Sequence, residues 1–98
     1  MLDVISMIHR DTQLTNGRLN DFVDAGRFKM SIQAGVGYQC SPKIDGLAPY
    51  LYDTFEVAVY PFPPKHIDMK FSGYKMHIYG NVPKNVLQKL YEMLCAEE

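Results

Sequence analysis

The chain lacks the features that would mark a secreted or membrane-bound protein. Its 98 residues contain no apolar run near the roughly 20 residues that cross a bilayer. The segment from Met1 to His9 lacks the basic start, apolar centre and small-residue cleavage site of a signal peptide. Two cysteines, Cys40 and Cys95, do not make the disulfide framework of a small secreted domain. We therefore expect a cytoplasmic protein with free thiols and no membrane partner.

The chain also lacks an excess of charge of one sign. Ten basic and eleven acidic residues give a formal net charge of -1, so nothing predicts broad electrostatic capture of nucleic acid or of an anionic membrane. Nucleic acid is therefore disfavoured as the main partner. With 98 residues, of which 47% are hydrophobic, the chain suffices for one small core and not for a second. We predict a single domain that spans residues 1–98.

The motifs of common catalytic and cofactor sites are missing or incomplete. Gly35-Val36-Gly37 follows a strand pattern as a dinucleotide fingerprint does, but the third glycine is absent and Ser41-Pro42 follows in place of a helix. His66 and His77 each precede an isoleucine, yet the hydroxyl residues of phosphoesterases with paired His-x-Ser/Thr motifs are missing. The histidines and cysteines show no metal-ligand spacing, and no pair of carboxylates suits acid–base chemistry. The sequence predicts no catalytic residue, no metal site and no cofactor.

Alternating apolar and polar residues predict strands. Apolar side chains recur at every second position in residues 27–34 and in residues 52–60, which is the pattern of a half-buried strand. Prolines at positions 61, 63 and 64 end the second strand, because they cannot donate to a sheet ladder. Residues 67–71 and 74–78 alternate again around Ser72-Gly73, which predicts a hairpin. The predicted inward side chains of the first two strands are Phe28, Met30, Ile32, Ala34, Phe55, Val57 and Val59.

Helical spacing occurs at both ends of the chain. The apolar residues between Leu2 and Ile8 fit a helix or a strand, and we favour a helix. Residues 18–25 place three apolar side chains on one helical face, and Gly26 suits the end of such a helix. Pro83 fits the first position of a C-terminal amphipathic helix whose apolar stripe runs from Val86 to Cys95.

These patterns together predict the fold class. We expect an α+β domain with an antiparallel sheet of about four strands, a short N-terminal helix, and a C-terminal helix that covers one face of the sheet.

The loop from Gly35 to Lys43 is the main candidate for binding. Gly35 and Gly37 free the backbone for a positive φ or for close approach to a ligand, and Pro42 keeps the loop from continuing as a central strand. Such a loop suits an anion or a nucleotide. Three aromatic residues fall in predicted loops and are candidates for stacking on a base or filling a partner's pocket: Tyr38, Tyr50 and Phe62.

Several short motifs along the chain resemble a family of short bacteriophage proteins. The motifs are Ser31-Ile32-Gln33-Ala34-Gly35, Tyr38, Cys40-Ser41-Pro42-Lys43, Phe55-Glu56-Val57 and Ile78-Tyr79-Gly80-Asn81-Val82-Pro83. Their order and spacing cover about two thirds of the chain, from Met30 to Leu90, and leave Met1 to Lys29 outside. The pattern is similar to the Thoeris anti-defence sponge proteins, which sequester cyclic ADP-ribose-type signals made by the immune system of an infected bacterium.

The resemblance implies a phage-type protein that binds a small nucleotide signal without turnover. Such a ligand needs N–H groups or cations for its phosphates, an aromatic face for its base and polar side chains for its riboses. In this family the residue at position 43 is expected to be an arginine, so the lysine here offers a point charge in place of a bidentate fork. A tyrosine is expected where this chain has Asn81. We assign Arg27, Gly35, Gly37, Ser41 and Lys43 to the phosphate, Tyr38 to the base, and Gln33 and Asn81 to the sugar.

Two other classes of function stay open. The first is a phage inhibitor or interaction module that docks on a host or defence protein through exposed aromatic residues. The second is a small enzyme with Cys40 as nucleophile, because a loop thiol close to Lys43 would be activated. A simpler interpretation of Cys40 is a small apolar side chain beneath the loop.

We also expect a homo-oligomer. A 98-residue chain offers little concave surface, so the ligand site is expected between subunits. The wide apolar stripe of the C-terminal helix, which a small sheet would not cover completely, supports the same expectation.

Overall fold

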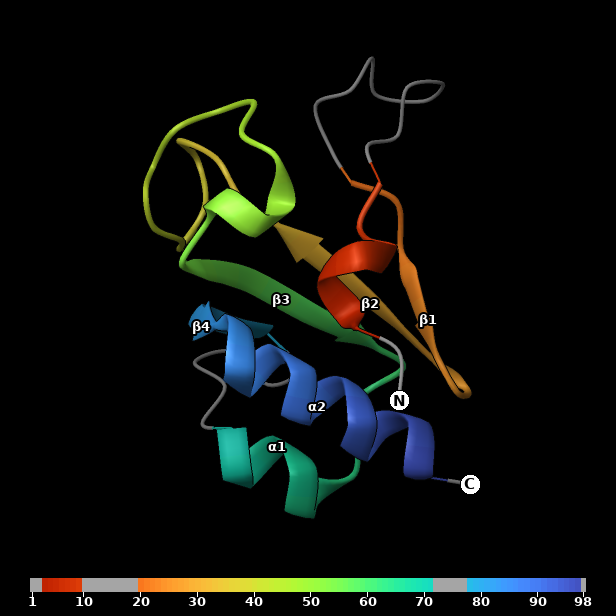
Figure 1. Ribbon diagram of the computed structural model, residues 1–98. Coiled ribbons are helices and arrows are strands. Elements are labelled where there is room, and N and C mark those ends of the chain that lie inside the picture. Colours follow the sequence, from red (N-terminus) through yellow and green to blue (C-terminus); the bar gives the residue numbers. More distant parts are fainter. Residues whose placement is uncertain (1–2, 10–19, 72–77, 98) are drawn as a thin grey trace.

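A four-stranded antiparallel sheet forms the centre of the protein in the computed structural model, which describes residues 3–9, 20–71 and 78–97 (Figure 1). The strands are β1 (Val23–Ala25), β2 (Phe28–Gln33), β3 (Thr54–Tyr60) and β4 (Ile78–Pro83), and they lie in the order β1-β2-β3-β4. The sheet with its C-terminal helix and a short N-terminal 3-10 turn confirms the predicted α+β fold class.

Strands β2 and β3 confirm the two alternating patterns. They pair antiparallel, with Met30 opposite Val59 and Ile32 opposite Val57, and all four side chains are buried. Paired residues point to the same face of a sheet, so the two strands place their apolar side chains in one core. Ala34 lies just beyond β2 and packs against that core.

The helix predicted for residues 18–25 is wrong in its described part. Val23–Ala25 form β1 and pair with Phe28–Met30 across a two-residue turn at Gly26 and Arg27. Gly26 has a φ of 62°, which fits the first central position of a hairpin turn as well as the residue after a helix. Gly26 therefore indicates where the element before it ends, but not whether that element is a helix or a strand. Residues 10–19 lie outside the described residues.

The hairpin predicted for residues 67–78 is also wrong where it can be seen. Lys65–Phe71 form the helix α1, and Ile67 is buried in the core. The carbonyl of Pro64 accepts hydrogen bonds from the N–H groups of Ile67 and Asp68, which starts the helix. The predicted turn at Ser72-Gly73 and its second strand up to residue 77 lie outside the described residues.

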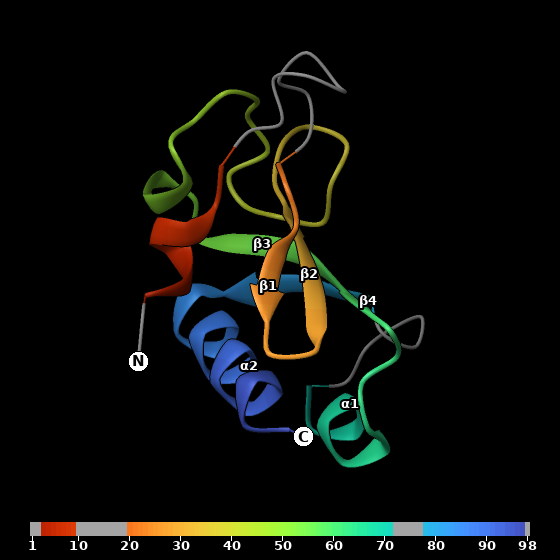
Figure 2. The same cartoon turned by 90° about the vertical axis from the view of Figure 1, so that its right-hand side faces the viewer.

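The helices lie on one side of the sheet (Figures 1 and 2). The C-terminal helix α2 (Lys84–Ala96) confirms the predicted amphipathic helix and begins directly after Pro83. It packs against β1, β4, α1 and the 3-10 turn η1 (Val4–Met7), which takes the place of the predicted N-terminal helix. Four side chains of its stripe are buried: Leu87, Leu90, Tyr91 and Leu94.

The sheet, η1 and α1 cover most of the α2 stripe within one chain. Val86 and Cys95, at its two ends, are partly buried against the same core. The stripe therefore does not itself require a second subunit, and the homo-oligomer stays a prediction. Among the described helices, none has the length and apolar character needed to cross a membrane.

Candidate functional site

The loop between β2 and β3 closes on itself around Cys40. The Cys40 thiol is buried, accepts a hydrogen bond from the Gly35 N–H (3.2 Å) and lies 3.3 Å from the Gly35 carbonyl oxygen. The Tyr38 N–H donates to the same carbonyl (3.2 Å). Among the described residues, every hydrogen-bond partner of the Cys40 thiol is a backbone group, including the Pro42 carbonyl. Attack by Cys40 on a substrate would require the loop to open.

Two carboxylates of the protein already occupy N–H groups of this loop. The Val36 N–H donates to Asp45 Oδ1 (2.9 Å), and the Gln39 N–H donates to Glu56 Oε1 (3.0 Å). Gly35 has a φ of 147°, and a Cβ at this position would lie 2.4 Å from Asp45 Oδ1. Glycine is thus needed at position 35 because a carboxylate packs against it. Close approach was predicted at Gly35, but the group that approaches belongs to the chain itself.

Tyr38 lies close enough to both carboxylates for their charges to act on its phenol, and it is half-buried. Its ring packs near Gly35, since a Cβ there would be 3.7 Å from Tyr38 Cδ2. Burial, followed by the negative charges of Glu56 and Asp45, raises the pKa of the Tyr38 phenol. The surroundings of the ring therefore favour a partner that donates hydrogen bonds over one that carries negative charge.

A polar cluster forms where this loop crosses β3 and β4. We call it the rim cluster and define it as Gln39, Ser41, Thr54, Glu56 and Asn81. The Ser41 and Thr54 hydroxyls share a hydrogen bond (3.1 Å), and Thr54 also donates to Asn81 Oδ1 (3.4 Å). Asn81 donates through Nδ2 to Gln39 Oε1 (3.3 Å), and its backbone N–H donates to the Gln39 carbonyl (2.8 Å). Residues from three separate segments are thus joined in one network that is in part exposed.

The backbone at Asn81 explains how its side chain reaches the loop. The pairing of β3 with β4 changes register between Phe55 and Val57, which places one extra residue in β4. Asn81 lies in this irregularity with a φ of 50°, a conformation that asparagine tolerates better than most residues. The irregularity turns its amide toward Gln39 and Thr54.

Two of the predicted ligand residues lie elsewhere or are already occupied. Arg27 is in the β1–β2 turn, at the opposite end of β2 from the loop, with its guanidinium 4.4 Å from the centre of the Phe28 ring. Gln33 is buried, and its amide accepts from the Asn20 N–H (2.9 Å) and donates to the Asn20 carbonyl (3.1 Å). Its second amide proton bonds Ser31 Oγ (3.0 Å). Gln33 therefore ties the chain before β1 to the sheet.

The other two loop residues are exposed. Gly37 has no atom within 4 Å of the place where a Cβ would stand, so space does not require glycine there. Lys43 is exposed, and no hydrogen bond or ion pair joins its side chain to a residue of the described ranges. It is thus a cation with its donors available to a ligand.

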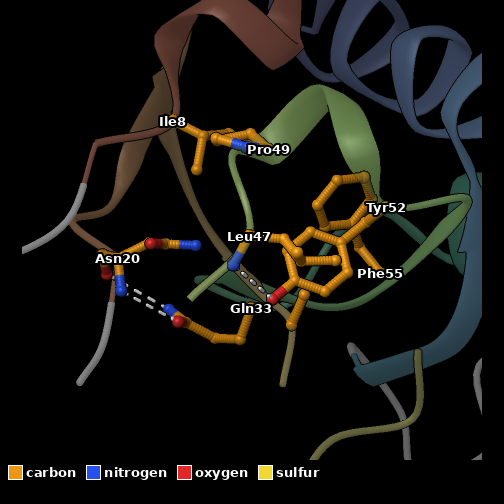
Figure 3. A pocket seen from close by; sticks show the side chains of 8 residues that line it. Ile8, Asn20, Gln33, Leu47, Pro49, Tyr52 and Phe55 are labelled. Carbon is orange, nitrogen blue, oxygen red and sulfur yellow. Dashed lines mark hydrogen bonds between the residues drawn. The ribbon is translucent and has the colours of Figure 1, made fainter. Parts of the chain in front are cut away.

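Two hollows of the described surface have no residue of the Gly35–Lys43 loop in their lining. A chamber of about 60 Å³ is lined by polar groups of Asn20 and Gln33 and by apolar side chains that include Ile8 and Phe55 (Figure 3). An open groove of about 320 Å³ lies next to it and shares Ile8 and Pro49 with its lining. The chamber is far below the roughly 300 Å³ at which small-molecule sites begin, and the groove is near that lower bound. The exposed ring of Tyr50 lines the groove, beside Asp3, Ile5 and Ser6.

Sequence reasoning missed Gln39, Asp45, Thr54 and Glu56. Thr54 and Glu56 occupy outward positions of a predicted strand, where the default interpretation is a solvated side chain. The position of Asp45 in the sequence is typical of a solvated turn residue, and nothing in its spacing from Gly35 indicates contact. In the described parts of the chain, no group of three or more histidine, cysteine or carboxylate side chains is placed to hold a metal ion.

Comparison with known protein families, with curated proteins and with solved structures finds no match for this chain.

Proposed function

We propose that the protein binds a small nucleotide signal of the cyclic ADP-ribose type stoichiometrically, as a phage anti-defence protein in the cytoplasm of an infected bacterium. The observation that carries the proposal is the rim cluster. Ser41 and Asn81, which the sequence assigned to the ligand, come from distant segments and are joined through Thr54 in this partly exposed cluster. Tyr38, also assigned to the ligand, lies on the same loop as Ser41, and the charge of Glu56 in the cluster acts on its phenol.

The chemistry of the rim cluster suits the sugar and base of a nucleotide. Ribose hydroxyls both donate and accept, and the amides of Gln39 and Asn81 and the hydroxyls of Ser41 and Thr54 can do the same. Glu56 adds an acceptor for a hydroxyl or for the amino group of a base. The Tyr38 ring offers an apolar face beside them. Lys43, exposed on the same loop, is the group that would meet a phosphate.

Sequestration without turnover is supported by the state of Cys40. The side chain is buried, and the partners of its thiol in the described chain are backbone groups. A nucleophilic thiol needs a neighbouring base and access to the substrate.

The proposed binding protein works as a homo-oligomer. Neither of the two hollows described above has a rim-cluster residue in its lining, and tight ligands are usually buried over most of their area. A second subunit placed over the cluster would supply the missing wall, so the site lies between subunits.

The first test is chemical. Protein purified from infected cells is examined by native mass spectrometry, then heated, and the released small molecule is identified. Calorimetry with ADP-ribose and cyclic ADP-ribose then compares the wild type with Asn81→Gly, which keeps the positive φ and removes the amide. We expect binding by the wild type, release of unchanged ligand, and about five- to fiftyfold weaker binding by the variant, the loss of one or two hydrogen bonds. Asn85→Ala on α2 is the control.

A protein partner is the second candidate function, because exposed apolar side chains flank the open groove. Tyr50 is 67% exposed and Leu51 53% exposed in the 3-10 turn η2 (Pro49–Leu51). Exposed aromatic and aliphatic groups beside a groove are typical of a docking surface. If no nucleotide gives heat in calorimetry and Tyr50→Ala abolishes capture of a defence protein, this candidate replaces the first.

A further inference from the structure

We infer that Asp45 is a built-in competitor for the anionic part of the ligand and so determines how strongly the Gly35–Lys43 loop binds anions. This inference rests on the proposed function, because it concerns the same loop. The contact behind it is the hydrogen bond from the Val36 N–H to Asp45 Oδ1 (2.9 Å).

The carboxylate occupies the position that a ligand anion would take. Glycine-rich loops bind anions through backbone N–H groups, and here the N–H that follows Gly35 already donates to a negative oxygen. The missing side chain of Gly35 makes room for that oxygen, which would be 2.4 Å from a Cβ. A phosphate oxygen could bond the Val36 N–H only after Asp45 has left.

A second contact on the same loop follows the same chemistry. The Gln39 N–H donates to Glu56 Oε1 (3.0 Å), so two loop amides are each held by a carboxylate of the protein. Both negative charges lie close enough to Tyr38 to affect its phenol. The backbone N–H groups of the loop thus bind anions, and in the folded chain two carboxylates of the protein already fill this role.

Asp45 is the carboxylate that can be displaced. Asp45 is exposed and lies next to Gly46, whereas Glu56 lies within β3 and is only partly exposed. Water can replace the Val36 N–H as partner of an exposed carboxylate at small cost. Displacement of Asp45 would also move its charge away from the phosphate, while Lys43 provides a cation on the same loop.

The test compares anion binding by the wild type and by Asp45→Asn. The asparagine keeps an oxygen that accepts from the Val36 N–H, so the loop stays closed, but it carries no charge. The probe is inorganic pyrophosphate, titrated into ¹⁵N-labelled protein while the Val36 and Gly37 amide signals are followed. We expect pyrophosphate to bind Asp45→Asn about five- to thirtyfold more tightly than the wild type, the size expected when one like charge is removed from an anion site.

Two further variants make the result specific. Asp53→Asn removes the same charge from an exposed position whose side chain accepts from no N–H group of the loop, and it is expected to change binding by no more than about twofold. Glu56→Gln repeats the design at the Gln39 amide, so the inference stays testable if Asp45→Asn alters the loop. Equal affinities of the wild type, Asp45→Asn and Glu56→Gln, or no binding of pyrophosphate by any of them, would overturn the inference.

A parallel titration with ADP-ribose separates this inference from the proposed function. If ADP-ribose binds the wild type and Asp45→Asn equally, the inference fails and the proposed function stands. If pyrophosphate binds the variants as expected and no nucleotide binds any of them, the proposed function fails while the role of Asp45 is supported.

Discussion

At the scale of single residues, the partners of each loop side chain decide what it can do for a ligand. Gln33 and Cys40 have their polar atoms committed to neighbouring groups of the chain. The Lys43 side chain has no hydrogen-bond or ion-pair partner in the part of the chain that is described. Removal of its amino group should therefore change binding and leave stability unchanged. Tyr79 shows the opposite case, a buried polar group that serves the fold.

Lys43→Ala is expected to weaken binding of the nucleotide about ten- to a hundredfold, because a charge-assisted contact is worth roughly 1.5 to 3 kcal/mol. Its melting temperature should stay that of the wild type, since exposed positions without partners usually change stability by under about 0.5 kcal/mol. Lys43→Arg should hold or improve the affinity, because a guanidinium binds phosphate bidentately. Calorimetry and thermal melts check both variants. An alanine variant that binds as tightly as the wild type removes Lys43 from the site.

Tyr79→Phe tests a partly buried hydrogen bond between β4 and α1. The Tyr79 hydroxyl donates to Asp68 Oδ1 (2.7 Å), and burial, this hydrogen bond and the charge of Asp68 raise the pKa of the phenol above its usual 10.0. In the unfolded chain the phenol loses its proton near pH 10.0, so above that pH the unfolded state binds fewer protons than the folded state. The stabilising contribution is therefore complete below pH 10.0 and decreases as the pH rises beyond it.

We expect Tyr79→Phe to lower the free energy of unfolding by about 1–3 kcal/mol at neutral pH, through loss of a hydrogen bond to a charged group. The difference from the wild type should become smaller at pH values above 10.0. Urea unfolding of both proteins on either side of that pH measures it. A difference that stays constant across this range would contradict the assignment.

At the scale of elements, turns and caps decide what each segment becomes. The β1–β2 turn lies against the end of α2: a Cβ at Gly26 would be 3.3 Å from the Leu94 carbonyl oxygen and from Cys95 Cα. Gly46 also has a positive φ, of 82°, but no atom lies within 4 Å of its Cβ position. The two glycines therefore separate the cost of the backbone conformation from the cost of close approach.

Gly26→Ala is expected to lower the free energy of unfolding by about 2–3 kcal/mol, and Gly46→Ala by about 1 kcal/mol. Both variants carry the strain of a positive φ, and only the first also presses against backbone atoms of α2. Chemical denaturation of the two proteins under the same conditions gives the comparison. Equal losses would show that the contact with α2 adds nothing.

At the scale of the whole molecule, the helices cover one side of a single sheet (Figure 1). The rim cluster joins the β2–β3 loop to the first residue of β3 and to the irregularity of β4. The apolar stripe of α2 is largely satisfied within one chain. A homo-oligomer is therefore predicted from the partly exposed proposed site and not from that stripe.

Sedimentation velocity at micromolar concentration, with and without the nucleotide, should give the mass of an oligomer, which is a whole-number multiple of the 11.2 kDa chain and larger than one chain. Binding of a nucleotide with an unchanged monomer mass would show that one chain suffices for the site. Such a result would place the missing wall of the site in the same chain.

The sequence by itself determined the parts of the fold in which burial repeats with a local period. β2, β3 and α2 are long enough for the spacing of their apolar residues to distinguish a strand from a helix. The spacing is regular because the inward side chains of all three elements pack in one core. β1 and α1 are too short for this test. Val23–Ala25 are the last residues of a segment that ends at Gly26 and also fits a helix. Lys65–Phe71 contain an alternation that also fits a strand.

Only the tertiary structure decided which polar groups meet. The sequence marked the Gly35–Lys43 loop, Ser41 and Asn81 as candidates, but the network that joins them depends on the pairing of β3 with β4 and on the extra residue at Asn81. The occupation of the Val36 N–H by Asp45 likewise depends on how the loop closes. A hydrogen bond requires a few ångströms of distance and a defined angle between atoms, and those quantities are set by the folded backbone and not by spacing along the chain.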